Sequence, residues 1–126
     1  DAYLPELNSL LEFDEIQHFT LQREISLEHY PNDFEFGYSK SLYHSICKKY
    51  LARNKKVKGG FSRPTREFPF DGGRHCQRAL FDAVKDMLPP LFGYKNTIRV
   101  SSTEVLDGDG RISISMTDKI WRRISA

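Results

Sequence analysis

Apolar and polar side chains alternate along residues 18–30. The apolar members stand at odd positions and the polar members at even positions: Phe19, Leu21, Ile25 and Leu27 are apolar, and Thr20, Gln22, Glu24, Ser26 and Glu28 are polar. A period of two is typical of a strand with one buried face, so the pattern predicts a strand here, closed by a turn at residues 31–33. Arg23 is the exception on the face that is predicted to point inward.

Two longer stretches repeat their apolar side chains at helical spacing. The first follows Ser39, a residue type that caps helix N-termini, and the second follows Asp71, which can cap in the same way. The stripes are Leu42, Tyr43, Ile46, Cys47, Tyr50 and Leu51 in the first stretch, and Cys76, Leu80, Ala83, Val84, Met87 and Leu88 in the second. They predict two amphipathic helices with buried apolar faces, the second of which is stopped by Pro89 and Pro90.

The two ends of the chain complete the predicted architecture. Leucines at helical spacing around Pro5 predict a short helix ending near Phe13. Residues 97–106 and 111–117 both alternate, and the Asp-Gly-Asp-Gly turn between them predicts a C-terminal hairpin, which residues 120–124 either extend or cover with a short helix. We therefore expect an α+β domain: a small mixed or antiparallel sheet of at least three strands, with two amphipathic helices packed on one face.

The composition fits one domain. A chain of 126 residues with 39% apolar residues is long enough to bury a core without disulfides or a metal, so we treat residues 1–126 as a single domain that can belong to a longer protein. Cys47 and Cys76 stand at apolar helical positions, which indicates reduced core thiols and an intracellular location, cytoplasmic or nuclear. No apolar run approaches the roughly 18 residues of a membrane span, so no membrane partner is expected.

Charge is distributed unevenly, although the net charge is only +2. Residues 1–35 hold nine Asp and Glu against one Arg, whereas residues 36–66 hold nine Lys and Arg and no acidic residue. The remaining 67–126 are nearly balanced. The basic stretch is therefore the strongest candidate for a surface that contacts an anionic partner.

The basic stretch combines cations with aromatic side chains, as nucleic-acid surfaces do. Cations release counterions from phosphates, and aromatic rings stack on unpaired bases. The residues assigned to a nucleic-acid site are Lys48, Lys49, Arg53, Lys55, Lys56, Lys58, Phe61, Arg63 and Arg66. The first three also suit the negative end of the helix dipole, whereas Lys55, Lys56 and Lys58 are predicted to lie beyond the helix.

Two alternatives compete with a nucleic-acid site. The same cations could bind a protein or another anionic surface. They could also be covered within the molecule by the acidic residues 1–35, since runs of charge are often only solvated faces.

A second basic group opens the helix that follows Asp71. Its positive side chains oppose the helix dipole and repel one another, so an anion bound at the helix N-terminus would relieve the conflict. The residues of this candidate phosphate site are Gly72, Gly73, Arg74, His75 and Arg78. The alternative is that Asp71, Asp82 and solvent balance the charge.

Neither a complete metal signature nor a complete catalytic signature is present. The DGDGRIS sequence at residues 107–113 resembles part of a calcium loop, but Val105 and Met116 stand at the two anchoring ligand positions, so a hairpin turn is the better interpretation. The groups that could serve zinc or nucleophilic chemistry are His44, Cys47, His75 and Cys76. Their spacing fits no familiar zinc site, and we assign no catalytic residue, no metal and no cofactor.

Several segments occur in an order known from one protein family. They are the alternating segment HFTLQREISLEHY, the helix SKSLYHSICKKYLAR, the FPFDGG sequence of residues 68–73 and the hairpin TIRVSSTEVLDGDGRISISM. In this order the chain resembles the N-terminal domain of Argonaute and Piwi proteins. The resemblance implies a domain of an RNA-silencing protein that contacts or wedges the guide–target duplex, with catalysis in a different domain.

The sequence as a whole favours a non-enzymatic domain that binds RNA or another single-stranded nucleic acid through its basic helix end and loop. The alternative is a protein-interaction or scaffolding module, whose opposed acidic and basic faces engage a partner or a second copy of the chain. An enzyme ranks third, because the Cys and His residues named above are its only convergent titratable candidates.

Overall fold

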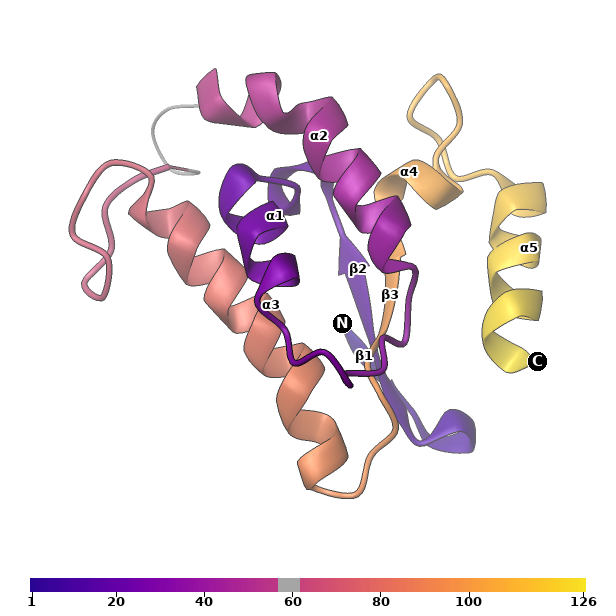
Figure 1. Ribbon diagram of the computed structural model, residues 1–126. Helices are drawn as coiled ribbons and strands as arrows, with labels where there is room; N and C mark the ends of the chain where they lie inside the picture. Colours follow the sequence, from indigo (N-terminus) through magenta and orange to yellow (C-terminus); the bar gives the residue numbers. More distant parts are fainter. Residues whose placement is uncertain (57–61) are drawn as a thin grey trace.

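The computed structural model describes residues 1–56 and 62–126 (Figure 1). The helices and strands are β1 (Ala2–Leu4), β2 (Ser9–Asp14), α1 (Leu21–Glu28), α2 (Lys40–Lys56), α3 (Gly73–Leu91), β3 (Ile98–Ser101), α4 (Ser102–Val105) and α5 (Ile114–Ser125). Short 3-10 turns, Pro5–Leu7 and Ile16–His18, lie on either side of β2. The expected α+β class is confirmed.

A single three-stranded sheet in the order β1-β2-β3 lies at the centre of the fold. β1 pairs antiparallel with β2, with Tyr3 opposite Leu10, and β2 pairs parallel with β3, with Phe13 opposite Val100. The parallel connection between β2 and β3 contains α1, α2 and α3. The sheet is therefore mixed, and its three strands match the lower bound of the prediction.

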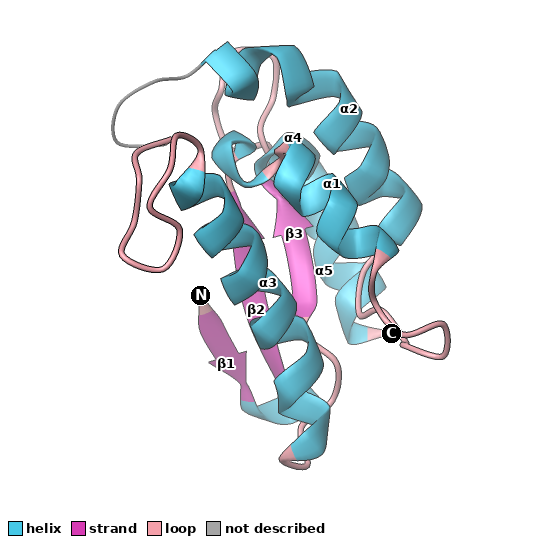
Figure 2. Ribbon diagram, turned by 60° about the vertical axis from the view of Figure 1, so that its left-hand side comes forward, coloured by secondary structure: helices cyan, strands magenta, loops and turns pink. Residues whose placement is uncertain are grey.

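Helices lie on both sides of the sheet (Figures 1 and 2). On one side, α1 packs against both α2 and α3. On the other side, α5 faces the strands across an apolar cavity of about 190 Å³, lined among others by Leu11, Phe13, Val100, Ile120, Trp121 and Ile124. The predicted arrangement, with two helices on one face of the sheet, is therefore only part of the observed one.

The N-terminal segment forms two strands, and the predicted helix ending near Phe13 is wrong. Pro5 opens only a single 3-10 turn, and Asn8, with φ of 49°, turns the chain into β2. The buried side chains of β2 include Glu12 and Asp14, which pair with cations of α3 and β3. An extended segment beside β3 reaches these partners, so ion pairing outweighs the helical spacing of the leucines.

Residues 21–28 form helix α1, and the strand predicted for residues 18–30 is wrong. Thr20 caps the helix, because its hydroxyl oxygen accepts a hydrogen bond from the backbone N–H of Arg23 (3.2 Å). The alternating pattern was ambiguous, since residues four apart share a face in a helix as well as in a strand. Arg23 and Leu27 are such a pair and are both buried, whereas Ile25 is half exposed.

The first predicted helix is confirmed as α2. Ser39 caps it, with its hydroxyl oxygen accepting from the N–H of Leu42 (3.2 Å). The helix extends further than predicted, so Lys55 and Lys56 belong to its last turn and also suit its dipole. The buried apolar cluster that it joins consists of Phe19, Leu27, Tyr30, Tyr43, Ile46, Cys47 and Ala83.

The second predicted helix is confirmed as α3, but it is rotated relative to its apolar stripe. Asp82 and Asp86 are buried against the sheet, whereas Leu80, Val84 and Leu88 are 48%, 38% and 43% exposed. The prediction of a buried apolar stripe is therefore wrong for these three residues. α3 presents a polar side to the sheet and an apolar side to solvent.

The two prolines near the end of α3 do not stop it where expected. The helix continues through Pro89 and Pro90 to Leu91. Pro89 has no N–H to donate to the carbonyl of Lys85, and the hydroxyl of Thr97 donates to that carbonyl instead (2.6 Å). This bond joins the last turns of α3 to the residue before β3.

Of the C-terminal hairpin predicted for residues 97–117, the turn forms but the second strand does not. Asp107 and Gly110 form the turn, and one isolated bridge joins Leu106 to Ile112. Ser113 then caps α5, so the second strand is absent and the helical cover is the alternative that holds. A helical repeat of apolar side chains over a 12-residue helix outweighs a short alternation, which by itself does not distinguish the two structures.

Candidate nucleic-acid interface

The C-terminal half of α2 and the first turns of α3 lie near one another at one end of the molecule (Figure 1), and both segments are rich in Lys and Arg. We call this group the basic surface; its described members are Lys48, Lys49, Arg53, Lys55, Arg63, Arg66, Arg74 and Arg78. None of these members forms an ion pair with a described residue. Within residues 1–56 and 62–126, the positive charge at this end is therefore not tied up in salt bridges.

The acidic residues 1–35 make their ion pairs elsewhere. Asp14 pairs with Arg99, and Asp1 and Glu12 pair with Lys85. Among the described residues, no ion pair joins this acidic segment to the basic surface. One ion pair does join the acidic segment to the basic stretch, between Glu28 and Lys40 (4.0 Å), but Lys40 is not a member of the basic surface.

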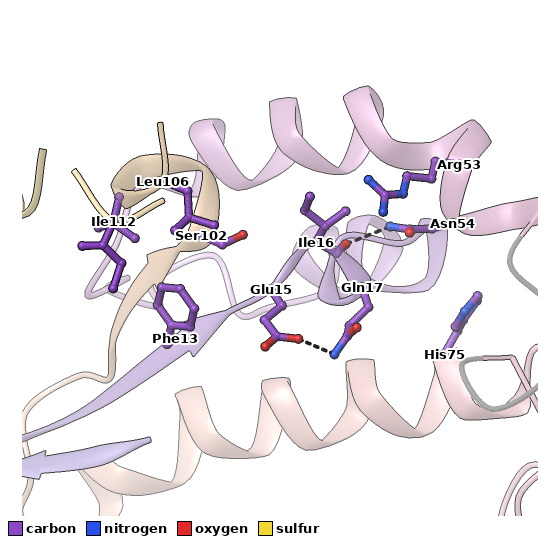
Figure 3. A pocket seen from close by; sticks show the side chains of 11 residues that line it. Phe13, Glu15, Ile16, Gln17, Arg53, Asn54, His75, Ser102, Leu106 and Ile112 are labelled. Atoms are coloured by element: carbon purple, nitrogen blue, oxygen red, sulfur yellow. Dashed lines mark hydrogen bonds between the residues drawn. The ribbon is translucent and has the colours of Figure 1, made fainter. Parts of the chain in front are cut away.

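A cleft of about 500 Å³ opens beside Arg53 (Figure 3). One end is apolar and is formed by Phe13, Val105, Leu106 and Ile112. The other end carries Glu15, Gln17, Arg53, Asn54 and His75. Its volume and its few polar groups beside an apolar wall suit a planar organic group such as a nucleobase.

A second cleft, of about 280 Å³, adjoins the first. Asn54 and His75 line both clefts, and Lys55 lines the second. The Asn54 amide is fixed in place, because its Nδ2 donates to the carbonyls of Ile16 (2.9 Å) and Phe19 (2.6 Å). The two clefts therefore adjoin each other at Asn54 and His75.

Two adjacent glycines build the start of α3. Gly72 is the N-cap in place of the predicted Asp71, and its φ of 84° lies in the region that favours glycine. Gly73 has no room for a side chain, since a Cβ would lie 1.9 Å from the carbonyl oxygen of Phe68. The backbone of the loop of residues 62–70 therefore packs directly against the first turn of α3.

The backbone N–H groups of this helix start already have acceptors. Residues 72–74 donate them to the carbonyls of Ser62, Phe70 and Arg63 over 2.8–2.9 Å. The candidate phosphate site therefore lacks the free N–H groups that such a site normally uses. A phosphate here would be held by the arginine side chains of the basic surface.

His75 is a polar group in the clefts and not a cation. Burial lowers the pKa of its imidazole, and the neighbouring Arg78 guanidinium lowers it further. The ring is therefore neutral at neutral pH and can exchange hydrogen bonds with a ligand without adding charge.

Some residues assigned from the sequence lie outside the described residues. This is true of Lys58 and Phe61, and of the side chain of Lys56. The stacking role of Phe61 stays a prediction. Phe13, the ring at the apolar end of the first cleft, was missed because the sequence placed it at the end of a helix.

A network of buried charges fills the space between the sheet and α3. Its centre is Arg99 of β3, which is 1% exposed. Arg99 Nη1 donates to Asp14 Oδ1 (2.9 Å), Nε donates to Asp86 Oδ1 (2.7 Å) and Nη2 donates to the Asp82 carbonyl (3.0 Å). Burial alone would lower the pKa of Arg99, but the three carboxylates outweigh it and raise the pKa. One guanidinium thus joins β2, β3 and α3.

Arg23 of α1 extends the network to the first helix. Its Nη2 donates to Asp86 Oδ2 (3.0 Å), and the hydroxyls of Tyr30 and Tyr38 donate to the same oxygen (2.7 and 2.6 Å). Burial raises the pKa of both tyrosines, and the Asp86 carboxylate adds to the effect against the opposing Arg23. The hydroxyls therefore stay protonated and satisfy a buried charge.

Asp14, His18 and Asp82 form the one group of metal-ligating side chains that the described residues bring within reach of a shared cation. However, Arg99 Nη1 already contacts the carboxylates of Asp14 (2.9 Å) and Asp82 (3.4 Å), and His18 Nδ1 lies 3.1 Å from Asp82 Oδ2. A metal ion would place further positive charge beside a buried guanidinium. We therefore interpret the group as part of the ion-pair network and not as a metal site.

The cysteines and histidines considered for zinc or for a nucleophile belong to no such group among the described residues. His44 lies 3.7 Å from Glu24. Cys47 lies in the apolar core, where burial raises the pKa of its thiol to about 12, so the reactive thiolate is not populated at neutral pH. Cys76 is only half-buried, in contrast to the core position expected for it.

The buried network is expected to weaken in acid. Burial alone would raise the pKa of Asp82, but the hydrogen bond with His18 and the cations of Arg99 and Arg23 outweigh it and lower the pKa. A carboxyl with a lowered folded-state pKa stabilises the fold above its unfolded value, about 3.9, and this stabilisation is lost as the pH falls through the folded value. The denaturant concentration at the unfolding midpoint should therefore decrease as the pH is lowered below about 4.

His18 provides the test of this pH dependence. In His18→Phe the pKa of Asp82 is less depressed, so the loss of stability should begin at a higher pH than in the wild type. The exposed His29, which bonds only to its own helix, gives the matched control His29→Phe. Superimposable acid profiles for His18→Phe and the wild type would contradict the assignment.

Comparisons with known proteins assign the chain to no family: no protein-family model, no curated protein and no solved structure matches it. Within residues 1–56 and 62–126, no helix is both long and apolar enough to cross a membrane. The fold and the site describe an α+β domain with a mixed sheet, a buried ion-pair network and a basic surface beside two clefts.

Proposed function

We propose that the domain binds single-stranded nucleic acid, in particular RNA, and acts as a binding module and not as an enzyme. The observation that carries the proposal is the basic surface, whose cations have no carboxylate partner among the described residues. Unpaired cations at one end of a nearly neutral protein favour a polyanion, since each phosphate contact releases condensed counterions.

The first cleft supports a single strand over a duplex. Bases in a duplex are stacked and paired, whereas an unpaired base can turn into a pocket and contact an aromatic ring. Phe13 and Ile112 would contact such a base at the apolar end, while Arg53 stands at the polar end, within reach of the phosphates of the same strand (Figure 3).

The proposal rests on this surface and not on the Argonaute/Piwi resemblance. The segment of residues 18–30, expected as a strand on that basis, contains helix α1, whereas the segment of residues 39–53 lies in and around α2 as expected. A place in RNA silencing stays a hypothesis.

Removal of two cations should reduce the salt dependence of binding. For a single-stranded RNA, the slope of log affinity against log salt is about −0.7 per phosphate contacted. Arg53→Ala combined with Arg63→Ala should therefore reduce the magnitude of the slope by up to about 1.4 and weaken binding for all sequences alike. Fluorescence anisotropy of a labelled oligonucleotide over a series of salt concentrations measures both quantities.

The matched control is Lys119→Ala, since Lys119 is an exposed cation on α5, outside the basic surface. It should leave both the slope and the affinity unchanged. If the wild-type chain binds no single-stranded RNA even at low salt, the proposed function is wrong.

An abasic oligonucleotide separates phosphate contacts from base contacts. If a base occupies the first cleft, an RNA should bind about 5- to 150-fold more tightly than an abasic strand of equal length, because a stacked base contributes about 1–3 kcal/mol. Phe13→Ala should remove that preference. Equal binding of the two strands would keep the basic surface as the binding site but exclude the cleft.

A further inference from the structure

The outer side of α3 carries an apolar ridge. Its large side chains are Leu80, Phe81, Val84, Leu88 and Leu91, which are 38–77% exposed, and Phe92 follows directly after the helix. Leu80, Val84 and Leu88 stand four residues apart, so they form one continuous row along the helix. Figure 2 shows α3 on the outside of the fold.

The ridge has a structural cause. α3 uses its opposite side, with Asp82 and Asp86, to meet the arginines of the buried network. A helix that satisfies buried charges on one side must place its apolar residues on the other. Burial of Asp82 and Asp86 thus leaves the apolar side of α3 exposed.

An apolar groove runs beside the ridge, between α1 and α3. It has a volume of about 560 Å³. Its main apolar walls are Ile25, Cys76, Ala79, Ala83 and Met87, and Leu80 stands on the border between groove and ridge. Among the described residues no Lys, Arg, Asp or Glu lines the groove, and its polar members are Gln22, Ser26, His29 and Tyr30.

The same surface thus carries a protrusion and a groove of matching apolar character, side by side. A two-fold axis near Leu80 would place the ridge of each copy in the groove of the other, which is the self-complementary relation that an isologous dimer requires. The exposed apolar area of the ridge is on the order of 600 Å², at the upper limit of patches on monomeric proteins. Together with the groove it approaches the ~800 Å² per partner of a stable interface.

We propose that two copies of this chain associate through the ridge and the groove of α1 and α3. The partner is a second copy of the chain, because the same face supplies both the ridge and the groove. This face carries no charge that would repel the same face of the second copy. This association is independent of nucleic-acid binding, since the basic surface lies at the end of α3 and not along this side.

Analytical ultracentrifugation of the whole chain tests the proposal. The wild type should shift from monomer to dimer as the protein concentration rises, and the dimer should persist in about 1 M salt, where exposed charge pairs are screened. Val84→Glu should weaken association at least about 100-fold, because it buries a carboxylate in an apolar interface. Ile114→Glu is the control: Ile114 is 83% exposed on α5, and this variant should dimerise as the wild type does.

The native Cys76 gives an independent measurement. Its thiol lines the groove, whereas Cys47 is fully buried. Alkylation of Cys76 should become slower as the wild-type concentration rises, and should not change with concentration in Val84→Glu. Circular dichroism confirms that this variant is folded.

Three results would overturn the proposal. They are a wild-type monomer at every concentration, a dimer that dissociates in high salt and so depends on the acidic and basic faces, and unchanged dimerisation of Val84→Glu. A monomer whose Cys76 becomes protected only when a different protein is added would assign the face to that partner and would equally exclude self-association.

Discussion

Arg99→Met is expected to unfold the domain or to lower its free energy of unfolding by about 3–5 kcal/mol. The substitution keeps most of the side-chain volume but removes the cation that Asp14, Asp82 and Asp86 share. Uncompensated carboxylates would then remain in the interior, where desolvation is costly. Since single domains are stable by about 5–15 kcal/mol, the loss is a large share of the total.

Denaturant unfolding followed by circular dichroism measures this loss. Arg111→Met is the matched control, since Arg111 is exposed and makes no ion pair among the described residues, and its midpoint should equal that of the wild type. Arg99→Lys should recover only part of the stability, because an ammonium group cannot reproduce the fork of contacts to β2 and α3. A midpoint of Arg99→Met equal to that of the wild type would show that the buried network does not stabilise the fold.

Gly73→Ala is expected to destabilise the domain by about 3 kcal/mol, the upper range for overpacking. The new methyl group would lie 1.9 Å from the Phe68 carbonyl oxygen, which is backbone and cannot move as a flexible side chain can. Either the loop of residues 62–70 leaves the helix start or α3 loses its first turn. Both outcomes would disturb the second cleft, which Gly72 and Ser62 help to line.

Gly108→Ala is the control for this prediction. Gly108 lies in an exposed turn and has no positive φ, and a methyl group added there would meet no neighbouring atom within 4 Å, so the change should be nearly neutral. Thermal unfolding of the two variants in parallel gives the comparison. Equal melting temperatures for the two variants would contradict the tight contact at Gly73.

The two long helices were predictable from the sequence because a stripe repeated over several turns has few interpretations. The short elements were not. Residues 18–30 and 4–13 satisfy more than one period, and their structure is decided by the partners of Arg23, Glu12 and Asp14, which lie far away in the chain. Long-range ion pairs leave no local pattern that a sequence alone could show.

Arg23 was the one signal of the buried network within the sequence. A charged residue on a predicted inward face indicates either a wrong period or a buried partner, and here both are true. The polar side of α3 gave no such signal, because Asp82 and Asp86 stand opposite the apolar stripe, where solvent-facing residues are expected. The assumption that apolar residues face inward therefore failed for this helix.

The candidate site was predictable in part. The cations of the basic surface were found from charge alone, and the structure places Arg53 of α2 and His75 of α3 along one cleft. The clefts were not predictable, since Phe13, Asn54 and Ile112 come together only in three dimensions. The candidate phosphate site at the α3 start was predicted from its basic side chains and the helix dipole, but the carbonyls of the preceding loop accept the N–H groups that would bind an anion.

The buried network also favours one register of the sheet over its neighbours. Arg99 pairs opposite Glu12 in the parallel ladder, and its neighbour Val100 faces α5. A shift of β3 by one residue would turn Val100 toward the three carboxylates and Arg99 toward the apolar side of α5. If the layer between the sheet and α3 were apolar, such a shift would cost little free energy. Because the layer is charged, a shift of β3 by one residue in either direction is costly. The charges thereby separate the correct pairing of β2 and β3 from its nearest competitors.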